Sequence, residues 1–260
     1  MGISCFIVCC NEESHIRRCL ESICWCDEII LIDSGSTDRT LDIAKEYTSR
    51  IVFRPWQGYV LQKQVGLSLC THEWVLNIDA DEEVSPELRK EIEAVVNGTQ
   101  TETINGYYIS RVVYYLGRWW RNGGWYPEFR LRLVRRNKAS WGGRDPHEKA
   151  LVTGETAYLN GELYHYTYQN MYDQVRRLNT HAKSAAQSMY EEGQTTSVLG
   201  ILAKPFTRFV KHFILKKGYR DGLPGFLIAV LESYYVFLKY AMLWELHQEN
   251  LRGDKKSSEL

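Results

Sequence analysis

The sequence has no excess of either charge and few cysteines, and both deficits narrow its possible functions. Its 260 residues hold 32 lysines and arginines against 32 aspartates and glutamates, so no overall positive field favours nucleic acid. Seven cysteines are too few for a disulfide-stapled secreted domain, and an odd number cannot pair fully within one chain. We therefore expect reduced, buried thiols and no nucleic-acid partner.

Targeting segments and long apolar runs are also missing. The first strand-like run begins at Ile3 without the basic region and cleavage site of a signal peptide, so we expect a cytoplasmic protein. No run of about 18 uncharged apolar residues occurs, and the best one, residues 223–231, ends at Glu232. These features predict a chain that does not cross a membrane.

Several common enzyme motifs are absent as well. The sequence contains no G-x-x-x-x-G-K-[ST] phosphate loop and no G-x-G-x-x-G after its first strand. It also lacks the G-x-S-x-G turn of α/β-hydrolases. These absences remove most of the support for kinases, GTPases, dehydrogenases and α/β-hydrolases.

The first hundred residues alternate between strand-like and helix-like patterns. The expected strands are residues 3–8, 28–33, 50–54 and 73–79. The expected helices are an apolar stripe over 16–23, a segment capped by Ser36 or Thr37, residues 57–70, and a segment opened by Ser85 and Pro86. This alternation predicts an α/β fold with a parallel open sheet, in which ligands bind at the carboxyl ends of the strands.

Polar turns follow three of these strands, at residues 11–12, 33–36 and 79–82. Asp79 and Asp81 extend two carboxylates from a strand end, which suits Mg²⁺ or Mn²⁺ and leaves coordination positions for phosphate oxygens. Alone, such a D-x-D turn is often only a solvated turn. Together with Asp33, whose carboxylate can accept hydrogen bonds from a base or ribose, it favours a nucleotide site.

Beyond residue 98 the pattern changes to strands and aromatic loops. We expect strands at 106–115, 129–135, 149–153 and 158–168, then a helix over 173–190. Residues 193–197 are typical of a linker. We therefore divide the chain into an α/β segment (1–97), a strand-rich segment (98–192) and a helical appendage (193–260).

Three segments, 8–13, 33–40 and 74–82, resemble the signature segments of glycosyltransferase family 2 in order and spacing. Within that family the chain resembles the branch that contains the lipopolysaccharide inner-core β-1,4-glucosyltransferases. The segments that carry this second resemblance are 54–59, 62–63, 116–119, 123–127, 130–133 and 147–148. The resemblance implies a GT-A fold, which is Rossmann-like with a mostly parallel sheet flanked by helices. It also implies a nucleoside-diphosphate sugar donor, a divalent cation and inversion at the anomeric carbon. In such a fold, residues 1–97 would be the nucleotide-sugar-binding half and residues 98–192 the acceptor-binding half.

The resemblance also implies roles for acidic residues at the donor. Glu12 and Asp33 would bind the nucleoside, and Asp81, helped by Asp79, would hold the metal on the donor diphosphate. Such a metal offsets the charge that builds on the departing diphosphate. Lys63 is a further candidate for a phosphate contact or for interaction with the base, and a solvated helix lysine is the alternative.

Inversion needs a carboxylate that accepts the proton of the attacking hydroxyl. We favour Glu148, because the pair 147–148 resembles a His-Glu pair of the branch; His147 would orient it or bind the metal. Glu128 is the reserve candidate, at a position where the branch commonly has aspartate, and Asp145 is a third. Alternatively, Glu148 is an acidic residue of a surface loop without a catalytic role.

Two clusters near these acids have functional and structural interpretations. Trp119, Trp120, Trp125 and Tyr126 lie in a glycine-containing loop that suits sugar stacking or a lid, with core packing as the alternative. A strand further on carries alternating arginines that could meet donor or acceptor phosphates, or could simply be exposed on an edge strand. They are Arg130, Arg132 and Arg135.

The C-terminal appendage predicts contact with a membrane surface. Residues 200–221 hold six basic side chains against one acid, with Leu202, Phe206, Phe209 and Phe213 on the opposing stripe. Such a basic amphipathic helix is typical of the membrane interface, and a helix packed on the catalytic domain is the alternative. Residues 225–246 could form the second arm of a helical hairpin.

The sequence thus favours an inverting hexosyltransferase that moves glucose from UDP-glucose to a lipopolysaccharide inner-core sugar. It would be a cytoplasmic enzyme, peripheral on the inner membrane and acting on a lipid-linked saccharide. Two alternatives remain open: transfer to a polyprenyl phosphate, and a non-catalytic membrane adaptor that kept the fold.

Overall fold

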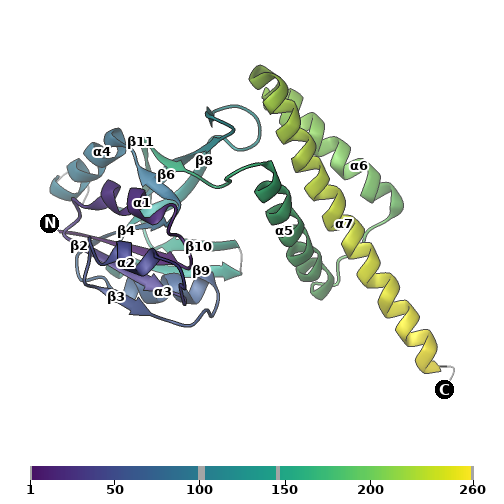
Figure 1. The fold of residues 1–260 in the computed structure, drawn as a ribbon, viewed down its shortest axis with the longest axis horizontal. Helices are drawn as coiled ribbons and strands as arrows, with labels where there is room; N and C mark the ends of the chain where they lie inside the picture. The colour runs from purple at the N-terminus through teal and green to yellow at the C-terminus, as the bar shows by residue number, and fades with distance from the viewer. Residues whose placement is uncertain (1, 99–102, 145–146, 259–260) are drawn as a thin grey trace. The chain divides into compact units, whose positions relative to one another are not determined.

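The computed structural model describes residues 2–98, 103–144 and 147–258, with side chains except at 144, 147 and 251–258. The chain forms two units. Unit 1 comprises Met1–Tyr114 and Pro127–Thr167, and unit 2 comprises Tyr115–Tyr126 and Tyr168–Leu260 (Figure 1). The division at residues 97 and 192 stays a prediction.

Unit 1 is built on a mixed, mostly parallel sheet with the strand order β3-β2-β1-β4-β8-β6-β11-β5. Its parallel half consists of β1 (Ile3–Cys9), β2 (Glu28–Asp33), β3 (Ile51–Phe53) and β4 (Trp74–Asp79). β1 lies between β2 and β4 and pairs with both in parallel. The predicted α/β fold with a Rossmann-like GT-A sheet is confirmed.

The other half of the sheet is largely antiparallel. β8 (Glu128–Arg135) runs antiparallel to β4 and to β6 (Ile104–Tyr115), and β6 pairs in parallel with β11 (Glu155–His165). β5 (Glu82–Val84) closes the edge, and β9 (Ala139–Arg144) with β10 (His147–Val152) forms a separate hairpin. Neither β5 nor β9 was predicted from the sequence. The three residues of β5 are too few to show the alternating pattern of a strand, and two glycines interrupt β9.

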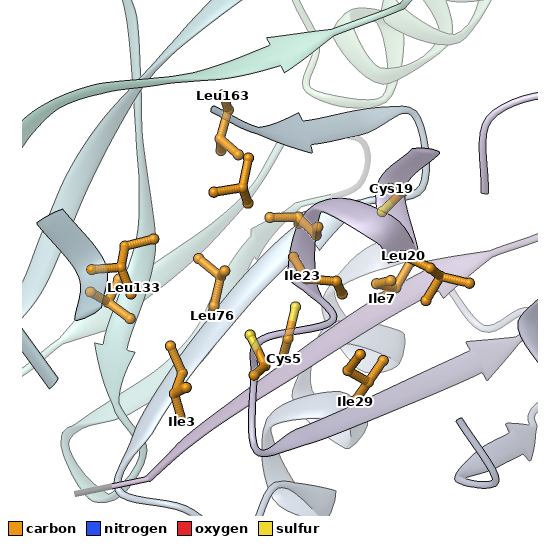
Figure 2. Close-up of a cluster of buried hydrophobic side chains, with 14 of the residues drawn as sticks. Ile3, Cys5, Ile7, Cys19, Leu20, Ile23, Ile29, Leu76, Leu133 and Leu163 are labelled. Carbon is orange, nitrogen blue, oxygen red and sulfur yellow. The ribbon is translucent and has the colours of Figure 1, made fainter. Parts of the chain in front are cut away.

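Helices cover both faces of the sheet. α1 (Ile16–Ile23), α2 (Thr40–Ala44) and α4 (Pro86–Asn97) contribute to one buried cluster, and α3 (Tyr59–Leu69) contributes to a second. Figure 2 shows Leu20 and Ile23 of α1 near Ile7 and Cys5 of β1. Each fully buried leucine or isoleucine of this kind stabilises the fold by roughly 1.5–3 kcal/mol, so the apolar stripe is sufficient to hold α1 on the sheet.

The helix starts were predicted with mixed success. Ser85 caps α4, since its Oγ accepts a hydrogen bond from Leu88 N at 3.1 Å and Pro86 is the first helical residue. The prediction that Ser36 or Thr37 caps the second helix was wrong, because α2 begins after Arg39 without a side-chain cap. Both residues instead bond to Asn11 in the preceding turn.

Unit 2 is mainly helical, with α5 (Met171–Glu191), α6 (Val198–Phe209) and α7 (Gly222–Ser258), plus the short strand β7 (Arg118–Trp120). The predicted basic helix over 200–221 is not continuous. A π-helical turn over Val210–Leu215 follows α6, and Lys217 reverses the chain with a φ of 59°. α7 then runs beside α6 and α5, as Figure 1 shows.

One segment, Gly218–Asn250, is long and apolar enough to cross a membrane by length and composition, with a mean hydropathy of 1.5. The segment is apolar on average, although Glu232 and Lys239 interrupt its uncharged run. Core helices of soluble proteins pass the same test. The expectation that no segment spans a membrane therefore stays a prediction.

Candidate active site at the carboxyl edge of the sheet

The turns after β1 and β2 are joined by a dense set of hydrogen bonds. Asp33 is buried, and its carboxylate accepts hydrogen bonds from Gly35 N at 2.9 Å and Ser36 N at 3.1 Å. Gly35 has a φ of 110°, which suits glycine. Asn11 is itself left-handed, with a φ of 57°, and its Oδ1 accepts from Thr37 N at 2.8 Å. Asp33 thus shapes the turn in which the nucleoside was expected.

Glu12 occupies the same edge but is more accessible. Its backbone N donates to Thr40 Oγ1 at 2.8 Å, and its Oε2 lies 3.2 Å from His15 Nδ1. The side chain keeps about a third of its surface exposed. Of the two predicted nucleoside contacts, Glu12 is therefore the one whose carboxylate faces solvent.

Lys63 on α3 connects the D-x-D turn with β10. It is only 3% exposed, and its Nζ lies 3.0 Å from Asp79 Oδ1 and 2.8 Å from Glu148 Oε1. The same ammonium lies 5.0 Å from the ring centroid of Trp141. The alternative of a solvated helix lysine is therefore wrong, because the charge is enclosed by two carboxylates and an aromatic ring.

Asp79 is also held from the sheet by Arg132. Arg132 Nη2 donates to Asp79 Oδ2 at 2.6 Å and to Glu82 Oε1 at 2.7 Å. Burial alone would raise the pKa of the Asp79 carboxyl, but the charges of Arg132 and Lys63 outweigh it and hold the pKa well below its usual range. Asp79 is thus firmly ionised between two cations.

The three strand arginines have different surroundings. Arg132 is buried on the acids just described, and Arg135 pairs with Glu73 and lies over the ring of Trp74. Arg130 remains exposed beside Glu128. Of these three side chains, Arg130 is the most exposed and is therefore the one best placed to meet a phosphate.

Asp81 contacts a histidine that was not predicted from the sequence. His165 lies at the end of β11, and its Nε2 is 3.2 Å from Asp81 Oδ2. Burial would raise the pKa of the Asp81 carboxyl, but the charge and hydrogen bond of His165 outweigh it and lower the pKa. The pairing of β11 with β5 brings His165 opposite Glu82, and no local pattern signals that register.

The spacing of this pair fits neighbouring ligands of an octahedral cation. Two ligands at about 2.1 Å on adjacent vertices are about 3 Å apart, close to the observed separation. No group of three or more histidine, cysteine or acidic side chains forms a metal site within the described part of the chain. The protein would thus supply Asp81 and His165, and donor phosphates the rest. The side chain of His147 lies outside the described residues.

The predicted catalytic acids differ sharply in environment. Glu148 is mostly buried against Lys63. Glu128 accepts hydrogen bonds at 3.0 Å from Arg111 Nε and from Arg130 Nε. Burial opposes ionisation of Glu128, but the two arginines prevail and lower its pKa from 4.5 to about 2. Glu128 is therefore a weak proton acceptor. Asp145 lies outside the described residues.

The aromatic loop belongs to unit 2, where two of its tryptophans are packed. Trp120 is buried and donates from Nε1 to Tyr115 O at 2.8 Å. Trp125 donates from Nε1 to Glu232 Oε1 at 3.0 Å and contacts the ring of Tyr168. These contacts favour core packing for both residues, while Trp119 and Tyr126 are half-buried.

Comparison with known proteins relates the chain to a family of glycosyltransferases. Residues 4–151 match Glycosyl transferase family 2. The lipopolysaccharide core biosynthesis glycosyltransferase LpsC of Rhizobium meliloti (strain 1021) is 30% identical over 95% of this chain and 93% of its own length. An uncharacterized glycosyltransferase of Rickettsia typhi is 31% identical over 94% of this chain and 87% of its own.

Solved structures also align with the chain. S. aureus TarS in complex with UDP-GlcNAc aligns over 96% of this chain and 92% of its own, with 14% identity and a TM-score of 0.47. Glucosyl-3-phosphoglycerate synthase from Mycobacterium tuberculosis aligns over 45% of each chain, with 26% identity and a TM-score of 0.36.

Proposed function

The chain belongs to glycosyl transferase family 2, and we propose that it transfers glucose from UDP-glucose to a lipopolysaccharide inner-core sugar with inversion. One observation carries the catalytic part: Lys63 joins Asp79 of the D-x-D turn to Glu148. The relative named for lipopolysaccharide core biosynthesis supports the acceptor class. The donor sugar rests on the resemblance of the sequence to the inner-core glucosyltransferases.

The donor site uses the carboxyl ends of β1, β2 and β4. Glu12 binds the nucleoside, and Asp33 holds the turn that receives it. Asp81 and His165 would hold Mg²⁺ or Mn²⁺ beside Asp79. When bound, such a cation neutralises charge that develops on the departing diphosphate. Lys63 adds a fixed positive charge at the same edge, which favours phosphate oxygens.

Glu148 is the proton acceptor in this proposal. The acceptor hydroxyl bonds to the anomeric carbon while the bond from that carbon to the diphosphate oxygen breaks. Glu148 takes the hydroxyl proton, and UDP leaves from the opposite face of the sugar. Lys63 keeps Glu148 Oε1 within 2.8 Å of its Nζ and so fixes the carboxylate at the site. Glu128 suits this role less, because its pKa of about 2 disfavours proton uptake.

The acceptor is lipid-linked in this proposal, and the enzyme is peripheral on the cytoplasmic face of the inner membrane. Exposed basic side chains of unit 2 support this location. Transfer to a polyprenyl phosphate is less well supported, because Arg132, one of the strand arginines expected to meet an acceptor phosphate, already binds Asp79 and Glu82. A non-catalytic adaptor would not need the buried Lys63 to connect Asp79 with Glu148.

Donor hydrolysis tests the proposal directly. The purified protein is incubated with Mn²⁺ and UDP-, GDP- or TDP-sugars, beside the Asp81→Asn variant. We expect slow hydrolysis of UDP-glucose that the variant loses. Preference for another donor would refute the donor assignment, and equal rates in both proteins would refute the role of Asp81.

Labelled donor then separates the acceptors. Lipopolysaccharide core lacking its outer sugars should become labelled, whereas polyprenyl phosphate should not. An acid-labile labelled lipid would instead establish the polyprenyl alternative. Donor binding without turnover on either acceptor would favour the adaptor.

A further inference from the structure

One side of α7 in unit 2 exposes a continuous apolar stripe. Leu223, Phe226, Val230, Phe237 and Trp244 are each 40–69% exposed. Their spacings of three, four, seven and seven residues place them along one face of a helix. At 1.5 Å per residue the stripe is about 30 Å long. An exposed apolar surface of this length is typical of an interaction site.

The charged side chains in this part of α7 lie away from the stripe. Between Leu223 and Trp244 the charged residues are Glu232 and Lys239. At 3.6 residues per turn both lie roughly 150° around the helix from the stripe. Glu232 accepts a hydrogen bond from Trp125, and Lys239 Nζ lies 5.1 Å from the ring centroid of Tyr240. The stripe therefore offers no charge to a partner.

A basic turn precedes the stripe in the chain. Its exposed cations are Lys211, Lys216, Lys217 and Arg220. They alternate with exposed apolar side chains, namely Ile214, Leu215 and Tyr219. Asp221 is the one acid between residues 198 and 231, and Arg118 Nη2 already binds it at 2.8 Å. The turn thus keeps an uncompensated positive charge.

A bilayer surface complements both features. Acyl chains accept an uncharged stripe, and anionic headgroups attract neighbouring cations at about 1 kcal/mol per basic residue. We propose that the α7 stripe and the basic turn together bind an anionic membrane surface, with α7 in the membrane plane. This inference rests on the proposed function, in which the acceptor is lipid-linked.

The contacts of α5 favour the in-plane arrangement over a membrane span. α5 lies along α7, with Tyr234 OH donating to Asn179 Oδ1 at 3.2 Å and the rings of Tyr190 and His247 4.8 Å apart. Arg176, Lys183 and Glu191 of α5 are exposed. If α7 crossed the bilayer, these charges would enter hydrocarbon at about 2.5–3.5 kcal/mol each for charges near its centre. This cost favours contact between lipid and the exposed stripe of α7 over a membrane span.

Vesicle binding tests the surface. The full chain is sedimented with vesicles of phosphatidylethanolamine and phosphatidylglycerol, beside a Val230→Lys/Phe237→Lys variant. We expect binding of the variant to fall at least about tenfold, because two charges enter the stripe. Tyr172→Lys on α5 is the matched control, since Tyr172 is an aromatic residue 80% exposed outside the stripe. Equal binding of all three proteins would overturn the proposal.

Two further measurements distinguish the remaining arrangements. A C-terminal tag on protein added to sealed vesicles should stay open to protease, whereas protection would establish a span. Sedimentation without lipid tests for a second copy: a dimer that the stripe variant dissociates, with vesicle binding intact, would overturn the membrane assignment. Neither measurement depends on catalytic turnover. A failure of the membrane proposal is therefore distinguishable from a failure of the proposed function, which is tested by the loss of donor hydrolysis in Asp81→Asn.

Discussion

The Nζ of Lys63 lies 2.8 Å from Oε1 of Glu148, although 85 positions separate the two residues in the sequence. α3 and β10 meet at this contact, and the same ammonium reaches Asp79 at the end of β4. A buried cation therefore joins the proposed metal-binding turn to the proposed base. The two halves of the predicted site converge on one side chain.

Loss of this cation should destabilise the protein. In Lys63→Met, Asp79 and Glu148 lose a buried partner, and we expect the free energy of unfolding to fall by about 3 kcal/mol. Urea unfolding measures the change. Lys45→Met is the control, because Lys45 forms an exposed ion pair with Asp42 and should change stability by less than about 1 kcal/mol.

The coupling can be separated from loss of packing. Glu148→Gln should cost less stability in the Lys63→Met background than in the wild type, since no cation then remains to be paired. A double-mutant cycle gives the difference. Additive effects of the two substitutions would contradict an energetic link between Lys63 and Glu148.

The choice of base gives a kinetic prediction. Glu148→Gln should lower kcat for transfer by about 10²–10⁴-fold, the usual effect of removing a general base. Donor hydrolysis and donor KM should change much less, because the donor site is retained. Glu128→Gln should have a smaller effect on kcat, since Arg111 and Arg130 already neutralise that carboxylate. A larger kcat loss in Glu128→Gln would transfer the role to Glu128.

The parallel half of the sheet was predictable because strands buried on both faces appear as continuous apolar runs. The burial of β1 and β2 follows that pattern closely. Carboxyl ends of parallel strands share one edge, so the positions of Asp33 at the end of β2 and of Asp79 at the end of β4 were predictable as well. The short strand β5 and the glycine-rich β9 could not be found, because neither shows a repeating pattern.

The electrostatic partners of the site could not be predicted in the same way. Arg132 and Asp79 are 53 positions apart, and His165 and Asp81 are 84 positions apart. The antiparallel pairings of β8 with β4 and of β11 with β5 bring these side chains to the D-x-D turn. Sequence patterns report the period of a single strand, whereas these contacts depend on strand order and register.

The pairing of Asp81 with His165 predicts a graded effect on metal binding. His165→Asn should weaken Mn²⁺ binding in the presence of UDP by about 10–100-fold, and Asp81→Asn by at least as much. Calorimetry with Mn²⁺ and UDP gives the affinities without turnover. His72→Asn is the control, since His72 lies near Ser4 and Glu28 at the opposite end of the strands. Unchanged affinity in His165→Asn would leave His165 outside the metal site.

His212 in unit 2 should make stability depend on pH. It is 5% exposed, and burial, with the charges of Arg208, Lys211 and Lys216, lowers its pKa from 6.5 to about 4. The folded protein therefore binds this proton less readily than the unfolded chain. The stability that His212 contributes is complete above pH 6.5 and falls as the pH drops toward 4, by roughly 3 kcal/mol in total. His212→Gln should remove this component. Urea unfolding followed by tryptophan fluorescence gives the free energy of unfolding of the wild type and the variant between pH 7 and 4. If both proteins lose stability equally as the pH falls, His212 has the same pKa in the folded and unfolded states, which would contradict the prediction.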